Sequence, residues 1–367
     1  MHNKPIAIIG AGNGGQAYAG WLALRGYTTR IYNARPGTVK ALEKAGAIEI
    51  QGNADHTGIG KFELVSTRID EVIRGCEVIN VIMPSNLHLM IADTLAPYLE
   101  DGQTIILTPA APFGAISFRH RLKEAGCKAD VTIAQTSTLL FACRLVEHGK
   151  VYVNGQKDRL SISAVPQNRN EKIKPLMAEL FPAYEFVNNI STVSFENINF
   201  EFHPGPTLLY TAMIEKGIPF EYYIDFVPSQ VKLIQAIDEE RMAIAPLLHA
   251  DVSNATETFR SMYPYEGDLY EMVTNADCYR GIKGPTSLQV RYLTEDVPYA
   301  LKVMQMLGKI VGVPTPVIDS VITLAYTLVG REAMGAGVTL GDFGFNGNTR
   351  LDDVLDAIYT GEVQNKQ

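Results

Sequence analysis

The feature that most constrains the fold lies near the start of the chain, where an apolar run breaks into a glycine-rich turn. The residues from Ile6 to Ile9 are all apolar, which is typical of a parallel strand buried on both faces. Gly10, Gly12 and Gly15 follow in the spacing GxGxxG, and the helical pattern beyond them stops at Gly26. The sequence therefore predicts a strand, a tight turn and a helix in direct succession.

Each glycine of this motif has a separate task. Gly10 permits the tight turn, Gly12 lets a pyrophosphate approach the backbone, and Gly15 allows the helix to pack closely on the strand. The unpaired N–H groups and the positive dipole at the helix start can then hold phosphate. A glycine-rich turn without a ligand is the alternative. The place of the motif between a strand and a helix favours a dinucleotide site formed by Gly10, Gly12, Asn13, Gly14 and Gly15.

Length and composition are typical of a globular protein with two domains. The chain has 367 residues, of which 46% are hydrophobic and 20% charged. The net charge of −8 argues against non-specific binding of nucleic acid.

The four cysteines lie far apart without metal-ligand spacing, so we expect reduced thiols and no metal site. No leader pattern and no run of about 18 apolar residues occur, so we expect a cytoplasmic protein without a membrane segment.

The end of the second expected strand, at residues 28–33, bears on which dinucleotide is bound. Folds of this kind place an acidic residue there to bind the 2′-hydroxyl of NAD, whereas a nearby arginine can accept the 2′-phosphate of NADP. Asn33 occupies this position, and Arg35 follows two residues later. We therefore predict NADP as the cofactor, with NAD as the alternative. A solvated loop charge is the alternative interpretation of Arg35.

Strands and helices alternate through the first half of the chain, which predicts a doubly wound parallel sheet of the Rossmann type. The buried strand expected at residues 78–83 ends at Pro84. Ligands bind beyond the carboxyl ends of such strands, so we expect Pro84 near the nicotinamide. Residues 48–64 are polar and punctuated by glycine, and the only strand predicted there is an edge or antiparallel one at 62–65.

The pattern changes near residue 187, where long helical patterns replace the short strands. We predict a dinucleotide-binding domain over residues 1–187 and an all-helical substrate and catalytic domain over residues 188–367. The glycine-rich residues 330–347 are predicted to form a surface loop. The longest helices are expected at residues 205–217, 229–250, 297–312 and 316–330.

Two segments of the second half complete a resemblance to a known family. Residues 197–206 read NINFEFHPGP, and residues 284–298 read GPTSLQVRYLTEDVP. Together with GAGNGG near the start, they resemble the opine dehydrogenases, that is, the octopine and nopaline dehydrogenases, over nearly the whole chain. The resemblance implies a dinucleotide-binding domain followed by an all-helical one. It also implies NAD(P)H-dependent reduction of the imine formed between a 2-oxo acid, such as pyruvate, and the amino group of an amino acid.

The resemblance further implies the roles of three residues. The catalytic histidine of the family falls on His203, its partnering aspartate on Asp296, and its substrate-binding arginine on Arg291. Histidine exchanges protons near neutral pH, and arginine can clamp a carboxylate with two hydrogen bonds. From the residues alone, however, His203 is one of seven histidines. Asp296 can equally complement the dipole of a helix that Thr294 caps, and Arg291 can be an exposed charge.

Other functions remain open at this point. Ketopantoate reductases and glycerol-3-phosphate dehydrogenases have a related architecture but usually rely on a catalytic lysine at the start of the helical domain. The first lysine after the His203 segment is Lys216, which disfavours both. A non-catalytic sensor that binds NADP is a further alternative. The sequence does not specify the amino acid, the 2-oxo acid or the oligomeric state, and a homodimer is compatible with it.

Overall fold

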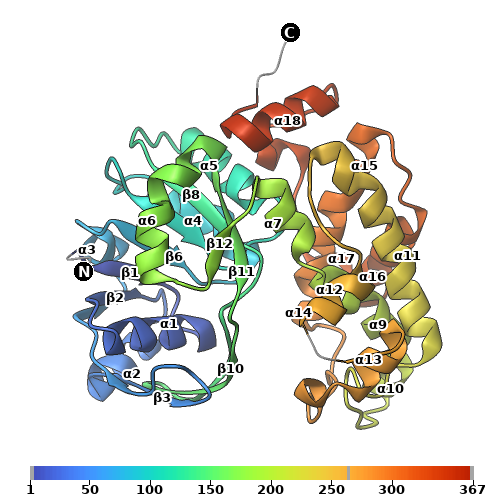
Figure 1. Ribbon diagram of the computed structural model, residues 1–367, viewed down its shortest axis with the longest axis horizontal. Helices are drawn as coiled ribbons and strands as arrows, with labels where there is room; N and C mark the ends of the chain where they lie inside the picture. Colours follow the sequence, from blue (N-terminus) through green and yellow to red (C-terminus); the bar gives the residue numbers. More distant parts are fainter. Residues whose placement is uncertain (1–3, 263–264, 364–367) are drawn as a thin grey trace. The chain divides into compact units, whose positions relative to one another are not determined.

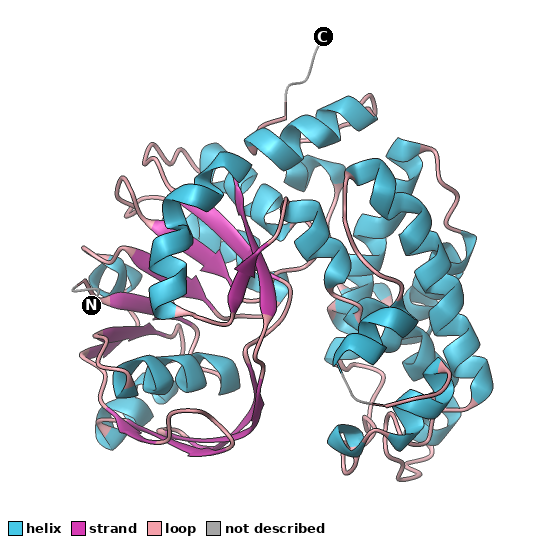
Figure 2. Ribbon diagram, in the orientation of Figure 1, coloured by secondary structure: helices cyan, strands magenta, loops and turns pink. Residues whose placement is uncertain are grey.

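The computed structural model describes residues 4–262 and 265–363, and their contacts divide them into two units (Figure 1). Unit 1 holds the described residues of Met1–Val193, Asp342–Gly344 and Leu355–Gln367. Unit 2 holds those of Ser194–Gly341 and Phe345–Val354. Figure 2 shows that all strands of the described residues belong to unit 1 and that unit 2 is helical. This division differs from a single cut at residue 187, because the end of the chain returns to unit 1.

Eight strands form the main sheet of unit 1: β1 (Ile6–Ile9), β2 (Thr29–Tyr32), β5 (Leu64–Ser66), β6 (Val78–Val81), β7 (Thr104–Leu107), β8 (Thr132–Thr136), β11 (Leu160–Val165) and β12 (Tyr184–Phe186). Their order is β12-β11-β8-β7-β6-β1-β2-β5. Six neighbouring strands of this sheet, in the spatial order β5-β2-β1-β6-β7-β8, are parallel. They follow the order 3-2-1-4-5-6 of the dinucleotide-binding fold. β11 pairs antiparallel with β8 and parallel with β12. The predicted fold class, a doubly wound parallel sheet followed by a helical domain, is confirmed.

A second sheet of four strands was not predicted: β3 (Ile48–Gly52), β4 (Gly58–Gly60), β9 (Phe141–Glu147) and β10 (Lys150–Gln156). Its order is β4-β3-β10-β9. The expectation for residues 48–64 is therefore wrong, because their glycines lie at strand ends. Gly60 even brings β4 so close to a helix that a Cβ there would overlap the Gly20 carbonyl oxygen. The strand expected at 62–65 is β5, which lies at the edge of the main sheet and pairs parallel with β2.

The helix that follows the glycine-rich turn, α1 (Asn13–Leu24), contacts strands of both sheets. Every residue from Gly14 to Leu22 is buried. This burial explains why α1 lacks an exposed polar face. Trp21, the single tryptophan, is 2% exposed, and its Nε1 donates a hydrogen bond of 2.6 Å to Asp55 Oδ1. The helix that follows the glycine-rich turn is thus held by the core of unit 1.

The remaining helices of unit 1 cover the main sheet, and α4 packs on α5 (Figure 1). Proline and glycine mark the two ends of α2: Pro36 starts the helix, and Gly46, with a φ of +67°, ends it. These helices are α2 (Pro36–Ala45), α3 (Ile69–Ile73), α4 (His88–Leu95), α5 (Gly114–Glu124) and α6 (Asn170–Leu180), with α7 (Ile190–Glu196) at the passage to unit 2.

Unit 2 is organised around α11 (Pro228–Ile244), which contacts the helices α8, α9, α13, α15 and α16. Most of the predicted long helices are present, but the one expected at 205–217 is divided at Tyr210. The other helices of this unit are α8 (Asn199–Phe202), α9 (Pro204–Leu209), α10 (Thr211–Glu215), α12 (Ala255–Met262), α13 (Leu269–Asn275), α14 (Arg291–Thr294), α15 (Lys302–Val311), α16 (Pro316–Val329), α17 (Arg331–Met334) and α18 (Leu351–Thr360), the last of which continues into unit 1.

The prediction of a surface loop over residues 330–347 is wrong in part. α17 and a 3-10 turn at Leu340–Phe343 lie within it. Met334 and Phe343 are each only 2% exposed. The glycines of this segment therefore separate two short helical turns whose apolar side chains are buried.

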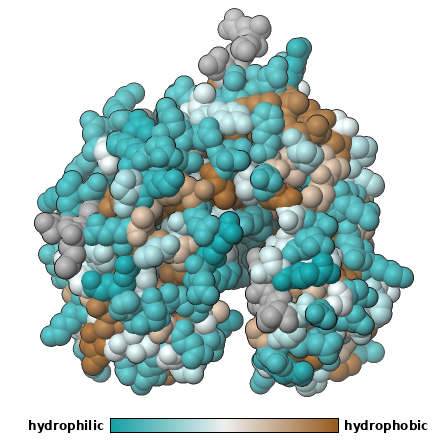
Figure 3. Space-filling model, in the orientation of Figure 1, coloured by the Kyte–Doolittle hydropathy of each residue, from teal (hydrophilic) through white to brown (hydrophobic). Residues whose placement is uncertain are grey.

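The surface is mainly polar on the face drawn in Figure 3, where apolar areas form separate patches. Large exposed apolar side chains include Leu324 and Leu328 on α16. Among the helices of the described residues, none combines the length and the apolar character needed to cross a membrane.

Candidate active site

His203 lies at the junction of α8 and α9 in unit 2. Pro204 follows it at the first position of α9, where a residue without an N–H group fits best. The backbone N–H of His203 donates to the Asn199 carbonyl at 2.9 Å, so the residue also closes α8. Its side chain is 13% exposed. The local sequence therefore holds one histidine in a bend between two short helices.

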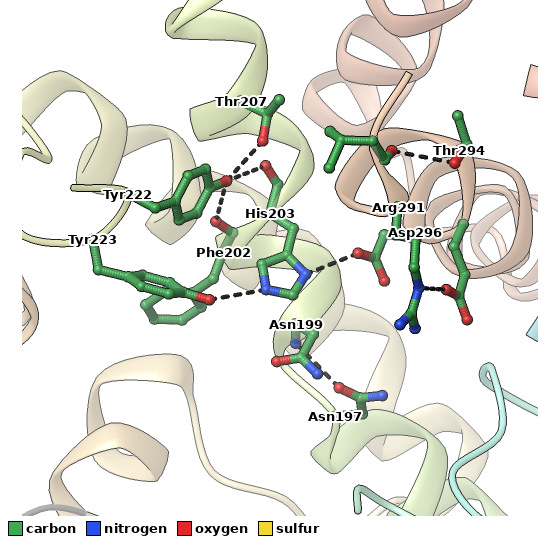
Figure 4. Close-up of polar contacts among 12 residues, drawn as sticks. Asn197, Asn199, Phe202, His203, Thr207, Tyr222, Tyr223, Arg291, Thr294 and Asp296 are labelled. Atoms are coloured by element: carbon green, nitrogen blue, oxygen red, sulfur yellow. Dashed lines mark hydrogen bonds and ion pairs between the residues drawn. The ribbon is translucent and has the colours of Figure 1, made fainter. Parts of the chain in front are cut away.

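Asp296 is the partner of this histidine (Figure 4). Its Oδ2 lies 2.9 Å from His203 Nδ1, and its side chain is 21% exposed. Burial raises the pKa of the Asp296 carboxyl above its ordinary value, and the hydrogen bond with His203 opposes that rise. An ionised carboxylate can only accept, so Nδ1 carries a proton in this pair. Nε2 is then the ring nitrogen that can take up or release a proton.

Three tyrosines that the sequence analysis did not identify surround the imidazole. Tyr223 places its hydroxyl 3.0 Å from His203 Nε2. Tyr292 stacks on the imidazole with ring centroids 4.1 Å apart and an interplanar angle of 20°. The hydroxyl of Tyr222 donates to the backbone carbonyl of His203 at 2.7 Å. For Tyr222 and Tyr223, the signal in the sequence is the density of aromatic residues at 220–226, which read FEYYIDF, whereas Tyr292 lies in the segment at 284–298 that carries the family resemblance.

Arg291, the third residue implied by the resemblance, is paired elsewhere. It starts α14, its side chain is 74% exposed, and its Nε donates to Glu295 Oε2 at 2.7 Å. Its positive charge still favours the ionised form of Asp296 and so acts to lower the pKa of that carboxyl. The structure thus joins His203 and Asp296 directly, whereas Arg291 forms an ion pair within one helical turn.

A buried group of charged side chains joins α8 to α11. Arg241 on α11 is fully buried, and its Nε lies 2.5 Å from Glu201 Oε1 on α8. The same guanidinium donates to Asp238 Oδ1 at 2.6 Å and to the Phe195 carbonyl at 2.7 Å. Burial raises the pKa of Glu201 to about 8, and Asp238 adds to the rise while Arg241 opposes it. The last turn before His203 is therefore fixed to the central helix of unit 2.

The glycine-rich turn of unit 1 has the shape of a phosphate cradle. Gly10 has a φ of +110°, which other residues rarely adopt. A Cβ at Gly15 would overlap the Gly10 carbonyl oxygen, whereas a Cβ at Gly12 would meet no atom within 4 Å. Gly12 caps α1 without a side-chain hydrogen bond, so the first N–H groups of the helix have no side-chain cap. Gly10, Gly12, Gly14 and Gly15 thus fit a dinucleotide pyrophosphate.

Asn13, in the same turn, has a structural partner. Its Oδ1 accepts a hydrogen bond of 3.1 Å from the Leu145 backbone N–H. Leu145 lies in β9, at the edge of the second sheet. The side chain of Asn13 therefore attaches the start of α1 to that strand.

The other residues predicted to bind the cofactor lie at the carboxyl ends of neighbouring strands. Asn33 follows β2, and its Oδ1 accepts a hydrogen bond of 2.9 Å from the Arg35 backbone N–H. Arg35 is exposed and precedes α2. Pro84 comes shortly after β6 and precedes a short 3-10 turn. Because β2 and β6 both pair with β1, these positions share one edge of the sheet with Gly10. The described residues contain no group of three acidic, histidine or cysteine side chains arranged to hold a metal ion.

Comparisons with known proteins agree on one family. The family model described as "NAD/NADP octopine/nopaline dehydrogenase, alpha-helical domain" matches residues 186–329. An opine dehydrogenase of Arthrobacter sp. (strain 1C) is 35% identical over 351 residues, which cover 95% of this chain and 97% of that protein.

Solved structures share the fold. An octopine dehydrogenase with NADH and L-arginine superimposes with a TM-score of 0.81 at 21% identity, over 99% of both chains. A yersinopine dehydrogenase with bound NADP+ superimposes with a TM-score of 0.72 at 14% identity, over 98% of both chains.

Proposed function

This chain belongs to the opine dehydrogenase family, and on that premise we propose that it condenses a 2-oxo acid with the amino group of an amino acid and reduces the resulting imine. The protein is an NAD(P)-dependent oxidoreductase that acts on CH–NH bonds. The observation that carries the proposal is the His203–Asp296 pair, which supplies a proton-transfer group in the helical unit. Family membership argues against the ketopantoate reductase and glycerol-3-phosphate dehydrogenase alternatives.

The proposed roles follow from the chemistry of each side chain. Asp296 holds Nδ1–H of His203 and stabilises the imidazolium that forms when Nε2 takes up a proton. Arg291 exchanges its ion pair with Glu295 for the carboxylate of the substrate, which it can bind with two hydrogen bonds. The bound dinucleotide supplies the hydride that reduces the imine carbon.

We further propose that the turn from Gly10 to Gly15 holds the pyrophosphate, with Pro84 near the nicotinamide. NADP is the favoured cofactor over NAD. Asn33 replaces the acidic residue that would repel a 2′-phosphate, and the exposed Arg35 is available to bind one. Both cofactors are used within the family.

The experiment measures oxidation of NADPH and of NADH by the full chain with pyruvate and each common amino acid. We expect turnover with at least one pair and a secondary-amine dicarboxylate as the product by mass spectrometry. Tight binding of cofactor without turnover of any pair would instead favour the NADP-binding sensor.

The setting of the reaction completes the proposal. No disulfide joins the four cysteines, which supports the proposed cytoplasmic location. The proposed partners are small molecules, namely the 2-oxo acid and the amino acid. A homodimer is the quaternary state we would test first, by light scattering of the purified protein.

A further inference from the structure

The hydroxyl of Tyr223 occupies the one position from which His203 can exchange a proton. Each imidazole nitrogen has a single hydrogen-bonding direction, in the plane of the ring. Asp296 takes the direction of Nδ1 at 2.9 Å, and Tyr223 takes that of Nε2 at 3.0 Å (Figure 4). A substrate atom therefore cannot bond to Nε2 in the same geometry while Tyr223 stays in place.

Tyr223 is held there by its ring as well as by its hydroxyl. The ring stacks on Tyr279 with centroids 4.1 Å apart and an interplanar angle of 18°. It also contacts Tyr222 edge-on at 4.9 Å, and the residue is only 8% exposed. Aromatic packing of this kind fixes the ring independently of the hydroxyl. The hydroxyl oxygen can accept one proton while it donates another, which is what a relay requires.

We propose that Tyr223 is a catalytic residue that relays the proton between His203 Nε2 and the reacting substrate. The proposal rests on the reaction proposed above and adds to it the residue that exchanges the proton with the substrate. In this arrangement Asp296 orients and stabilises the imidazole, His203 stores the proton, and Tyr223 delivers it.

The relay serves two proton transfers of that reaction. The substrate ammonium group first gives a proton to the Tyr223 oxygen as the Tyr223 proton passes to Nε2, which leaves a free amine and an imidazolium. After the amine has added to the carbonyl, the path runs in reverse. Tyr223 protonates the hydroxyl of the carbinolamine while Nε2–H reprotonates Tyr223. The C–O bond breaks, water leaves, and the nitrogen lone pair forms the C=N bond.

The test compares Tyr223→Phe with the wild-type enzyme and with Tyr210→Phe. Tyr210 belongs to the same aromatic group, but its hydroxyl donates to the Tyr222 carbonyl at 3.3 Å and not to His203. In Tyr223→Phe we expect kcat to fall about tenfold or more with little change in KM, because general acid–base catalysis is impaired. Substrates are pyruvate and the amino acid that the screen above selects.

The dependence of kcat on the deuterium fraction of the solvent distinguishes a relay from a structural role of Tyr223. When two protons are transferred in the same step, kcat depends on the deuterium fraction along a curve. We expect this curve in the wild type and in Tyr210→Phe, and a straight line in Tyr223→Phe. A straight line in an active wild-type enzyme, or unchanged kcat and curvature in Tyr223→Phe, would overturn the relay alone. Failure of every substrate pair in the wild type would overturn the proposed reaction and the relay with it.

Nitrogen-15 NMR of the resting enzyme tests the contact without turnover. The His203 Nε2 resonance should shift in Tyr223→Phe and stay in place in Tyr210→Phe. An Nε2 resonance that is the same in all three proteins would show that Tyr223 does not bond to His203, and the relay would be excluded.

Discussion

The glycine-rich turn of unit 1 and the His203 site of unit 2 are built in opposite ways. The turn consists of consecutive residues and presents backbone N–H groups, so its geometry follows from glycine itself. The His203 site draws side chains from positions 203, 223, 292 and 296, and only tertiary packing joins them. A function that rests on local backbone shape can be recognised in a sequence, whereas one that rests on side chains brought together cannot.

The largest expected effect tests whether the two sites are separable. His203→Ala should lower turnover at least about a hundredfold, the lower end of what general acid–base catalysis contributes, and leave cofactor affinity almost unchanged. Steady-state kinetics and cofactor titration measure the two quantities. His56→Ala, an exposed histidine in unit 1, is the control. If His203→Ala lost cofactor binding to the same degree as turnover, the assignment of separate roles would fail.

A pair of glycine substitutions separates the two tasks within the turn itself. Gly15→Ala should destabilise unit 1 by about 1–3 kcal/mol and abolish cofactor binding, because its Cβ overlaps the Gly10 carbonyl. A Cβ at Gly12 meets open space, so Gly12→Ala should leave the free energy of unfolding unchanged while it weakens cofactor binding. Urea unfolding followed by the fluorescence of Trp21 reports on unit 1. Equal stability of the two variants would contradict the structural role of Gly15.

Substitution of Arg35 tests the side-chain contribution to a site that is otherwise made of backbone. Arg35→Ala should weaken the binding of NADPH roughly tenfold, as expected for the loss of a hydrogen bond between charged groups, and leave the binding of NADH almost unchanged. Lys44→Ala, in the last turn of the same helix, is the matched control. Parallel weakening of NADPH and NADH would remove the reason for choosing NADP.

The smallest effect concerns stability and pH in the His203 site. Because burial raises the pKa of Asp296, the folded state binds its proton more tightly than the unfolded state does. The free energy of unfolding should therefore fall as pH rises from the ordinary pKa of aspartate to the raised pKa of Asp296. The total fall should be about 1.4 kcal/mol for each unit by which folding raises that pKa. Asp296→Asn should lack this fall. Unfolding free energies from urea titrations between pH 3 and 7 measure the difference, and identical pH dependence in both proteins would contradict it.

The same contrast explains how much of the fold could be predicted. The strands β1 and β6 were expected nearly where they lie, because short and largely apolar runs are typical of buried parallel strands. β3 was missed although Ile48 and Ile50 are buried, since the polar residues and glycines around them hid a short half-buried strand. Its partner β10 comes from a distant part of the chain, and nothing local specifies that pairing.

The candidate site shows the same limit more sharply. The Gly10–Gly15 turn could be interpreted from residue types alone, whereas His203 and Asp296 were selected by family resemblance. Tyr223 was predicted neither from residue types nor from the family resemblance. It lies 20 residues from His203 in the chain, and its contact depends on stacking against Tyr279 from another part of unit 2. Aromatic density at 220–226 indicates a core as readily as a site.

The way the chain divides between the units has a consequence for synthesis. It passes from one unit to the other after Val193, Gly341, Gly344 and Val354, and α18 begins in unit 2 and ends in unit 1. On the ribosome, unit 1 therefore lacks its segment from Leu355 onward until unit 2 has been made, although its glycine-rich turn is made before unit 2. Unit 2 completes its contacts before unit 1 does. A chain truncated directly after Val354 would therefore lose part of unit 1.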